Sequence, residues 1–301
     1  YVLNIEMVLP NGDIIWTGAN TLKYSTGYNL THLMVGSEGT LGIITKIVFK
    51  LIPLPKHDLL MLVPFTTAEK ACEAVGATFR AGITPSAMEF MERDAIDWSI
   101  KYAGEVNFEI KPEWQALLLI EVDGNNLEVL FNDCETISNI MTEHGCDDIL
   151  MADSAEQKAS LWKIRRKVGE AVKSNSVYKE EDTVVPRAEL PVLLTGVKEI
   201  GAKYGFKSVC YGHAGDGNLH VNIIKGELSD AVWETELPKG IIEIFELCKK
   251  LGGTISGEHG IGLVQKDYLS IVFPQHQLEL MRNIKRLFDP NMILNPGKMV
   301  F

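Results

Sequence analysis

The sequence predicts an α+β fold with an antiparallel sheet, and three observations favour it. From His57 onward, short apolar runs typical of strands alternate with longer amphipathic stretches typical of helices. The order of these strands and helices suits a layered sheet of ferredoxin-like type. Glycine-rich and Asn-Gly turns join neighbouring strand runs, as in β-hairpins.

The first 56 residues are expected to form a β-rich unit. The chain opens as a strand, an Asn11-Gly12 turn and a second strand, with no preceding segment. An apolar strand from Gly42 to Leu51 follows and ends at the breaker Pro53. We therefore expect the chain to begin inside a domain.

From His57 the pattern predicts alternating strands and helices. The expected strands are Leu59–Val63, Ala87–Met91, Ala116–Val122, one near Ile149, and the two runs Lys207–His213 and Asn218–Ile224. The expected helices are Thr67–Ala81, Asn126–His144, Ala159–Lys173, Leu190–Tyr204, Asp230–Leu251 and Gln275–Phe288. The stretch between Lys173 and Pro186 is predicted to be irregular.

Bulk composition narrows the class of protein. A chain of 301 residues suits about two domains, and 46% hydrophobic with 23% charged residues is ordinary for a globular protein. A net charge of -11 argues against a nucleic-acid partner. Five scattered cysteines without C-x-x-C spacing indicate reduced thiols, and no apolar run is long enough for a membrane span. We therefore expect a cytoplasmic protein with no transmembrane segment and no signal peptide.

Two histidines lie in the runs that flank the turn Ala214–Gly217. With this loop His213 faces Asn218, and side-chain alternation puts His220 on the same polar face. The two imidazoles are then diagonal cross-strand neighbours, roughly 5–8 Å apart, close enough to bind one metal ion. The alternative is a hairpin with two satisfied histidines.

A carboxylate and an imidazole sit side by side in the glycine-rich segment Gly252–Gly262. Glycine permits close approach of the backbone to a ligand. Glu258 would complete, with His213 and His220, a three-ligand site for a divalent metal with open positions, as in catalytic metal sites. His259 is then left for proton transfer. Zinc, manganese and iron all suit this ligand set.

Four motifs in order resemble one family. The segment Gly36-Ser37-Glu38-Gly39-Thr40-Leu41-Gly42 resembles the flavin-contacting segment of the FAD-linked oxidases with the vanillyl-alcohol-oxidase, or PCMH, type of fold. Three further motifs are similar to the D-2-hydroxyacid dehydrogenase branch of this family. They are Gly-His-Ala-Gly-Asp-Gly-Asn-Leu-His at 212–220, Gly-Glu-His-Gly-Ile-Gly at 257–262, and the closing Asp289-Pro290-Asn291 with Leu294–Lys298. That branch includes glycolate oxidase catalytic subunits and D-lactate dehydrogenases.

The resemblance implies a domain order. Residues 1–56 would be the second part of a PCMH-type FAD-binding domain, 57–274 the ferredoxin-like substrate and metal domain, and 275–301 a helix and tail that return to the FAD domain. Family members carry an earlier lobe that holds the FAD pyrophosphate. We interpret this chain as a fragment without that lobe and expect it to bind FAD weakly alone.

The resemblance also implies roles for single residues. Six residues would lie against FAD: Gly36, Ser37, Glu38, Gly39, Thr40 and Gly42; the alternative is a plain glycine turn. His213, His220 and Glu258 would hold the metal, which would lower the pKa of the substrate hydroxyl and fix the C–H bond toward the flavin, and His259 would remove the hydroxyl proton.

Substrate contacts follow from the same resemblance. Arg165 would clamp the substrate carboxylate with its planar fork, and Asn222 would hydrogen-bond it. The alternatives are a solvated helix arginine and a water-facing strand amide. Members specific for hydroxyglutarate hold the second carboxylate with a threonine and a lysine. Here Gly169 stands one helical turn after Arg165, where the threonine is expected. The stretch Tyr178–Asp182 has an acidic residue where the lysine is expected. Both departures favour a 2-hydroxymonocarboxylate such as lactate or glycolate.

The leading hypothesis is an FAD- and metal-dependent oxidoreductase that converts a D-2-hydroxy acid to the 2-oxo acid. A partner protein is the expected electron acceptor, and a homodimer is compatible with the sequence. Two alternatives stay open: a non-catalytic subunit of a multisubunit oxidase, and a metal-dependent hydrolase. The hydrolase gives no reason for the flavin-contacting segment at Gly36.

Overall fold

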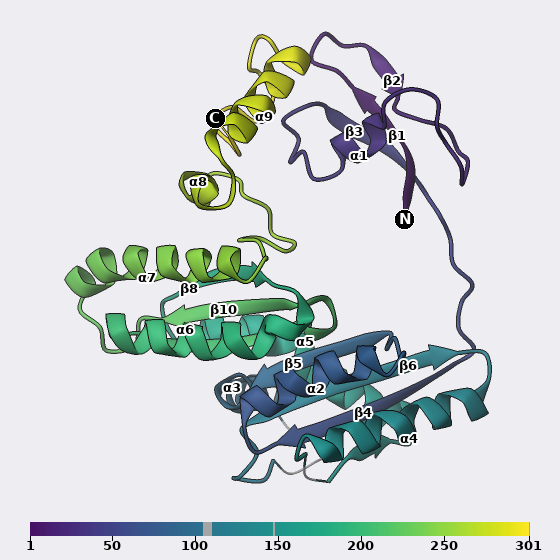
Figure 1. Ribbon diagram of the computed structural model, residues 1–301, viewed down its shortest axis with the longest axis vertical. Coiled ribbons are helices and arrows are strands. Elements are labelled where there is room, and N and C mark those ends of the chain that lie inside the picture. The colour runs from purple at the N-terminus through teal and green to yellow at the C-terminus, as the bar shows by residue number, and fades with distance from the viewer. Residues whose placement is uncertain (105–109, 147, 301) are drawn as a thin grey trace. The chain divides into compact units, whose positions relative to one another are not determined.

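The computed structural model describes residues 1–104, 110–146 and 148–300, which form two compact units (Figure 1). The smaller unit combines Tyr1–Leu54 with Glu258–Phe301, and the larger unit is Pro55–Gly257. The functional division at residues 56 and 274 stays a prediction, because compactness does not by itself assign a role to a domain.

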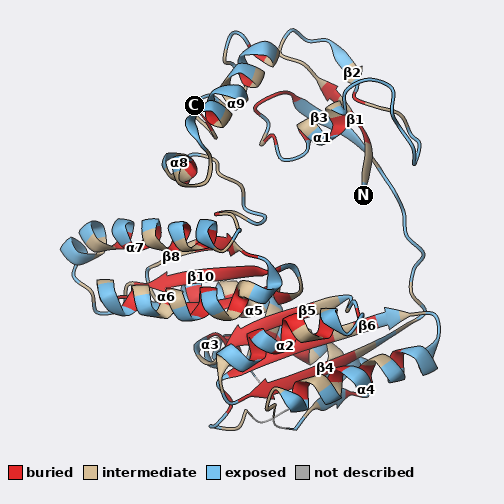
Figure 2. Ribbon diagram, in the orientation of Figure 1, coloured by how far each residue is buried: buried red, intermediate tan, exposed pale blue. Residues whose placement is uncertain are grey.

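A seven-stranded antiparallel sheet forms the centre of the larger unit, which confirms the predicted α+β class. The strand order is β7-β4-β6-β5-β9-β10-β8. The strands are β4 (His57–Phe65), β5 (Ala87–Glu92), β6 (Ala116–Gly124), β7 (Leu150–Ala152), β8 (Tyr178–Val184), β9 (Lys207–Gly212) and β10 (Asn218–Ile224). Their central residues are buried on both faces of the sheet (Figure 2).

Helices cover both faces of this sheet. On one side α3 (Arg93–Ala103) packs with α5 (Ala155–Asn175) over a core that includes Leu117, Val209 and Tyr211. The other helices pack against one another in the order α4-α2-α6-α7. Their bounds are Ala68–Arg80 for α2, Leu127–Glu143 for α4, Leu190–Tyr204 for α6 and Asp230–Lys250 for α7.

Side-chain caps explain why several of these helices begin where they do. Thr67, Asn126, Ser154 and Ser229 each accept a hydrogen bond from a backbone N–H in the first turn of the helix that follows. Gly205 ends α6 in the left-handed conformation, at φ +81°, where glycine has no steric penalty. Most predicted helix bounds are therefore within one residue of those in the structure.

Two predictions for this unit were wrong or incomplete. The stretch after Lys173 was predicted to be irregular, but it continues α5 to Asn175 and then forms β8. The apolar signal of a strand is missing there because its buried residues, Glu181, Asp182 and Thr183, are polar. Helix α3 was not predicted, since it begins directly after β5 without a side-chain cap.

The smaller unit contains a three-stranded antiparallel sheet in the order β2-β1-β3. Its strands are β1 (Val2–Val8), β2 (Ile14–Trp16) and β3 (Ile43–Phe49), and its helices are α1 (Leu30–Met34), α8 (Leu269–Val272) and α9 (Gln275–Phe288). Ile5 and Met7 of β1 pack with Met34, and with α9 through Ile284. Much of β3 is exposed (Figure 2).

Within residues 1–104, 110–146 and 148–300, no helix is long and apolar enough to cross a membrane. All five cysteines are free thiols, as the sequence predicted.

Candidate metal and substrate site

The hairpin of β9 and β10 places two imidazoles side by side. A short 3-10 turn, Ala214–Asp216, joins the strands, and Gly217 closes it at φ +76°. The backbone N–H of Asn218 donates to the carbonyl of His213 at 3.2 Å, so these two residues face each other as predicted. The ring centroids of His213 and His220 are 5.9 Å apart. Both rings can therefore reach one small ion.

Glu89 fixes the orientation of His213. The register of β5 with β9 places Glu89 opposite His213, and Glu89 Oε1 lies 2.9 Å from His213 Nδ1. Burial raises the pKa of Glu89, but the hydrogen bond with His213 and the positive charge of Arg165 together lower it below its usual value. An ionised carboxylate on Nδ1 directs Nε2 outward, as is usual for a histidine that binds a metal.

Glu89 also holds Arg165, which was predicted to bind a substrate carboxylate. Arg165 Nε donates to Glu89 Oε2 at 2.8 Å, and Nη2 of the same arginine lies 2.7 Å from that oxygen. The guanidinium carbon of Arg165 lies 5.4 Å from the ring centroid of Tyr211. A guanidinium has five N–H donors, so these contacts leave part of the fork for another acceptor.

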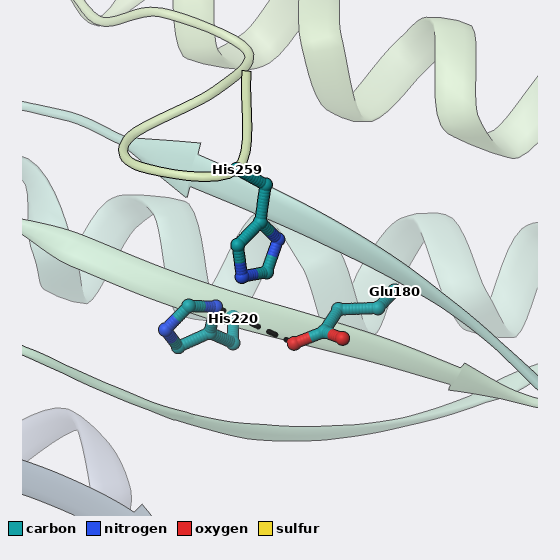
Figure 3. Close-up of side chains that lie close together, drawn as sticks. All are labelled: Glu180, His220 and His259. Atoms are coloured by element: carbon teal, nitrogen blue, oxygen red, sulfur yellow. Dashed lines mark ion pairs between the residues drawn. The ribbon is translucent and has the colours of Figure 1, made fainter. Parts of the chain in front are cut away.

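Tyr211 and Glu180 line the same polar face beside His220. Tyr211 is the direct cross-strand partner of His220, with ring centroids 5.3 Å apart. Glu180 Oε1 lies 3.5 Å from His220 Nδ1 (Figure 3) and 3.4 Å from the Tyr211 hydroxyl. Burial raises the pKa of Tyr211, and the negative charge of Glu180 adds to this effect. Tyr211 is therefore a neutral hydrogen-bond donor at physiological pH.

Asn222 lies on this face as predicted, but it does not face water. Its register partners are Val209 and Glu180, and only 1% of its surface is exposed. Within the described residues, neither side-chain amide atom makes a hydrogen bond of standard geometry. A buried amide without such bonds is costly, so a bound polar ligand would stabilise it.

Asp182 holds the glycine-rich segment against β8 and β10. Its fully buried carboxylate accepts hydrogen bonds from Asn218 Nδ2 at 2.7 Å and from the backbone N–H of Gly257 at 2.8 Å. A Cβ atom on Gly257 would lie 2.7 Å from Asn218 Nδ2, which is too close for any larger residue. Glycine is needed here for close packing against the protein itself. The close approach of this segment to a ligand stays a prediction.

Glu258 and His259 follow this anchored glycine directly. Both side chains are exposed, and they open the C-terminal segment of the smaller unit. Consecutive Cα atoms are about 3.8 Å apart, so chain continuity keeps the Cα of Glu258 within about 4 Å, and that of His259 within about 8 Å, of the Gly257 Cα. The structure thus gathers His213, His220, Arg165 and Asn222 on one face of the larger unit, whereas Glu258 and His259 belong to the smaller unit.

The predicted flavin-contacting segment forms a tight turn after α1 in the smaller unit. Gly36 and Gly39 have φ of +82° and +67°, and the Thr40 N–H donates to the Ser37 carbonyl at 2.9 Å. A Cβ on Gly42 would lie 1.9 Å from Met7 Cε, so the end of the Met7 side chain would have to move to admit a larger residue. Gly39, Gly42, Ile43 and Asn295 are among the residues that line a hollow beside the turn.

Sequence reasoning missed three residues of the larger unit: Glu89, Tyr211 and Asp182. A signal existed for Glu89, because a single carboxylate inside the apolar strand run Ala87–Met91 is unusual unless it has a partner. Tyr211 could have been found from the hairpin register that was predicted for His213 and His220. Asp182 could not, because its strand was predicted to be irregular.

Comparison with known proteins places these features in a wider group. The family model "FAD linked oxidases, C-terminal domain" matches residues 54–299. A D-lactate dehydrogenase of Anaerostipes hadrus is 37% identical over 305 residues, which cover 100% of this chain and 64% of that protein. A D-lactate dehydrogenase of Archaeoglobus fulgidus is 38% identical over 300 residues, with the same shares covered.

A glycolate oxidase subunit of Bacillus subtilis is 36% identical over 302 residues, which cover 99% of this chain and 63% of that protein. The chain thus spans less than two thirds of the length of these relatives. Among solved structures, substrate-bound p-cresol methylhydroxylase matches with a TM-score of 0.77 at 16% identity, over 100% of this chain and 65% of that chain. A 4-ethylphenol oxidase from Gulosibacter chungangensis, in an isoeugenol complex, matches with a TM-score of 0.74 at 16% identity, over 99% and 65%. Such low identity shows the fold alone.

Proposed function

Because this chain belongs to the FAD linked oxidases and carries their C-terminal domain, we propose that it takes part in the FAD-dependent oxidation of a D-2-hydroxy acid to the 2-oxo acid. The family predicted from the sequence motifs is thereby confirmed. Relatives named D-lactate dehydrogenase and glycolate oxidase subunit support the substrate class. The observation that carries the proposal is the shared carboxylate of Glu89, which holds His213 and Arg165 together on one polar face.

We propose that His213, His220 and Glu258 bind a divalent ion, either zinc, manganese or iron. The two imidazole rings are close enough for one ion, and Glu89 presents His213 in the manner of a metal ligand. Glu258 directly follows Gly257, whose backbone N–H donates to Asp182 of the same sheet. When bound, the ion supplies a Lewis acid that lowers the pKa of a coordinated hydroxyl group.

Arg165 and Asn222 are the proposed contacts of the substrate carboxylate. Arg165 projects from α5 onto Tyr211, and the buried Asn222 amide lies on the same sheet face with hydrogen-bonding capacity to spare. Together they fix the carboxylate, so that the adjacent hydroxyl carbon has one orientation. Arginine suits this role because its fork matches carboxylate geometry.

The substrate side chain would then meet Glu180 and Gly169. A Cβ on Gly169 would lie 3.4 Å from the Tyr211 hydroxyl, in ordinary van der Waals contact, and glycine itself supplies no side chain that could bind a second carboxylate. The carboxylate of Glu180 repels a second negative charge. A small 2-hydroxymonocarboxylate such as lactate or glycolate is therefore the proposed substrate.

His259 is the proposed base that takes the proton of the substrate hydroxyl. Imidazole suits this task because its ordinary pKa lies near neutral pH. The segment Gly36–Gly42 is the proposed contact of FAD, where glycines allow the backbone close to a planar cofactor and the adjoining hollow gives it room. Bound FAD supplies the hydride acceptor.

Metal binding to the apoprotein tests the proposal without needing turnover. Titration calorimetry with Zn²⁺ or Mn²⁺ should show one site, and His213→Ala or His220→Ala should abolish it. His144→Ala is a matched control, because its ring bonds to a helix carbonyl away from this sheet face. Unchanged binding in both site variants would contradict the assignment. We further propose a cytoplasmic location and a partner protein as the electron acceptor.

A further inference from the structure

Glu38 joins two loops of the smaller unit that are far apart in sequence. Its Oε1 accepts a hydrogen bond from the backbone N–H of Ile261 at 2.7 Å, and its Oε2 accepts one from Gly262 N–H at 2.8 Å. Both oxygens are thus engaged by consecutive amides, in the geometry of a small anion held by a backbone loop. Ile261 follows His259 by two residues, so the carboxylate binds the loop that carries the proposed base.

The backbone around this contact is shaped for it. Glu38 has a φ of +51°, a left-handed conformation that is uncommon for a residue with a side chain. Gly260 has a φ of +79°, and a Cβ at that position would lie 2.7 Å from Glu38 Oε1. The carboxylate therefore occupies the space that any larger residue at position 260 would need.

Two residues near the C-terminus, Lys285 and Asn295, also fix the turn that contains Glu38. Asn295 Nδ2 donates to the Glu38 carbonyl at 2.5 Å. The ammonium group of Lys285, which is 2% exposed, donates to the carbonyl oxygens of Thr40 at 2.7 Å and Leu294 at 2.8 Å, and it pairs with Asp289. The turn is thus held at its backbone, while the Glu38 side chain is directed to the His259 loop.

We infer that Glu38 is a positioning residue, which ties the Gly36–Gly42 turn to the His259 loop and so keeps the base at a constant spacing from the flavin-contacting segment. This inference rests on the proposed function of His259 and Gly36–Gly42. It differs from a direct contact with FAD, because both carboxylate oxygens already bind backbone amides. Misplacement of a catalytic group by about 1 Å can cost on the order of 10²-fold in rate, so such a tie has a kinetic consequence.

The first test measures the tie itself, by backbone amide hydrogen exchange in the wild-type chain and in Glu38→Ala and Glu38→Gln. Exchange at Ile261 and Gly262 should accelerate by about tenfold or more in Glu38→Ala, since bonds to a charged acceptor are lost. Glu38→Gln keeps one acceptor oxygen and should lie between. Glu6→Gln is the matched control, because Glu6 belongs to the same unit and its carboxylate accepts hydrogen bonds from Thr45 and Lys46.

The second test separates positioning from mere stability in the FAD-loaded, metal-loaded protein. Glu38→Ala should lower kcat by about 10²-fold with KM for a D-2-hydroxy acid nearly unchanged, and Glu38→Gln should restore part of the rate. Glu6→Gln should match the wild type in both constants. If Glu38→Ala only destabilised the protein, it would lower the amount of active protein and so reduce the rate by the same factor with every substrate.

Two results would overturn the inference. The first is an unchanged exchange rate at the Ile261 and Gly262 amides in Glu38→Ala. The second is a kcat of Glu38→Ala that is no lower than the kcat of Glu6→Gln, measured when the wild type is active. A flavin titration in which Glu38→Ala loses FAD affinity while exchange is unchanged would assign Glu38 to the cofactor instead. A wild type that oxidises no 2-hydroxy acid would contradict the proposed function, and the exchange result would still report on the tie.

Discussion

Glu89 Oε1 lies 2.9 Å from His213 Nδ1, and the second oxygen of the same carboxylate receives Arg165. One buried side chain on β5 therefore sets the position of a proposed metal ligand and of a proposed substrate clamp. Its pKa is lowered, so the carboxylate is charged when the site operates. The proposed roles of His213 and Arg165 are therefore coupled through this residue.

Glu89→Gln should weaken Zn²⁺ or Mn²⁺ binding by about 10–100-fold, because a neutral amide replaces the ionised carboxylate that orients His213 and raises its basicity. Calorimetric titration of the apoprotein measures this change. Glu121→Gln is the control, since Glu121 is a carboxylate of the same sheet that bonds to Ser86 and Trp162 instead. Equal metal affinity in Glu89→Gln and Glu121→Gln would show that His213 needs no such orientation.

The lowered pKa of Glu89 predicts how stability depends on pH. A carboxyl group with a folded-state pKa below its unfolded value of about 4.3 contributes stability that is complete above that value. The contribution is lost as pH falls through the folded-state pKa. In metal-free protein, the difference in unfolding free energy between the wild type and Glu89→Gln should be constant from neutral pH to about pH 5 and shrink below it. Urea unfolding across this range measures it, and a difference that grows in acid would be the opposite result.

Glu180 should determine whether a second substrate carboxylate is tolerated. Glu180→Lys replaces a repulsive charge with an attractive one, so the affinity of the metal-loaded protein for a five-carbon 2-hydroxydicarboxylate should rise at least about tenfold relative to D-lactate. Calorimetry of both ligands gives the ratio. Glu170→Lys makes the same charge change on α5, where Glu170 pairs with Lys167, and should leave the ratio unchanged. A loss of metal affinity in Glu180→Gln would instead identify Glu180 as a metal ligand.

Gly260 and Gly262 provide a matched pair for the Glu38 tie. Both have positive φ, +79° and +51°, so alanine is strained at either position by on the order of 1–3 kcal/mol. Only the Cβ of Gly260→Ala would meet the Glu38 carboxylate, since the space at Gly262 is open. Amide exchange at Ile261 should therefore accelerate more in Gly260→Ala than in Gly262→Ala. The reverse order would mean that backbone strain, and not the carboxylate, governs this loop.

Much of the larger unit was predictable because its strands and helices have the periodicity of their structural class. Helix Leu190–Tyr204 and strand Asn218–Ile224 were predicted with the bounds that the structure has. The hairpin register followed from the loop length, and it correctly placed His213 opposite Asn218. Local sequence determines these features, so no tertiary information was needed.

The parts that escaped prediction depend on contacts between distant segments. Strand β8 buries the polar residue Asp182, whose partners Asn218 and Gly257 lie on other segments, so no apolar alternation marks it. The partnership of Glu89 with His213 spans 124 positions, and that of Glu38 with Ile261 spans 223. Single-sequence patterns describe neighbours within a strand or helix and carry no information about such pairs.

The central claim is tested most directly by anaerobic mixing of the FAD- and metal-loaded protein with D-lactate while flavin absorbance is followed. The account predicts that D-lactate, but not L-lactate, bleaches the oxidised flavin. It also predicts that chelation of the metal stops the bleaching and that His259→Ala slows it by about 10²-fold or more while FAD stays bound. A flavin that no D-2-hydroxy acid reduces, or that D-lactate reduces equally well without metal, would contradict the account.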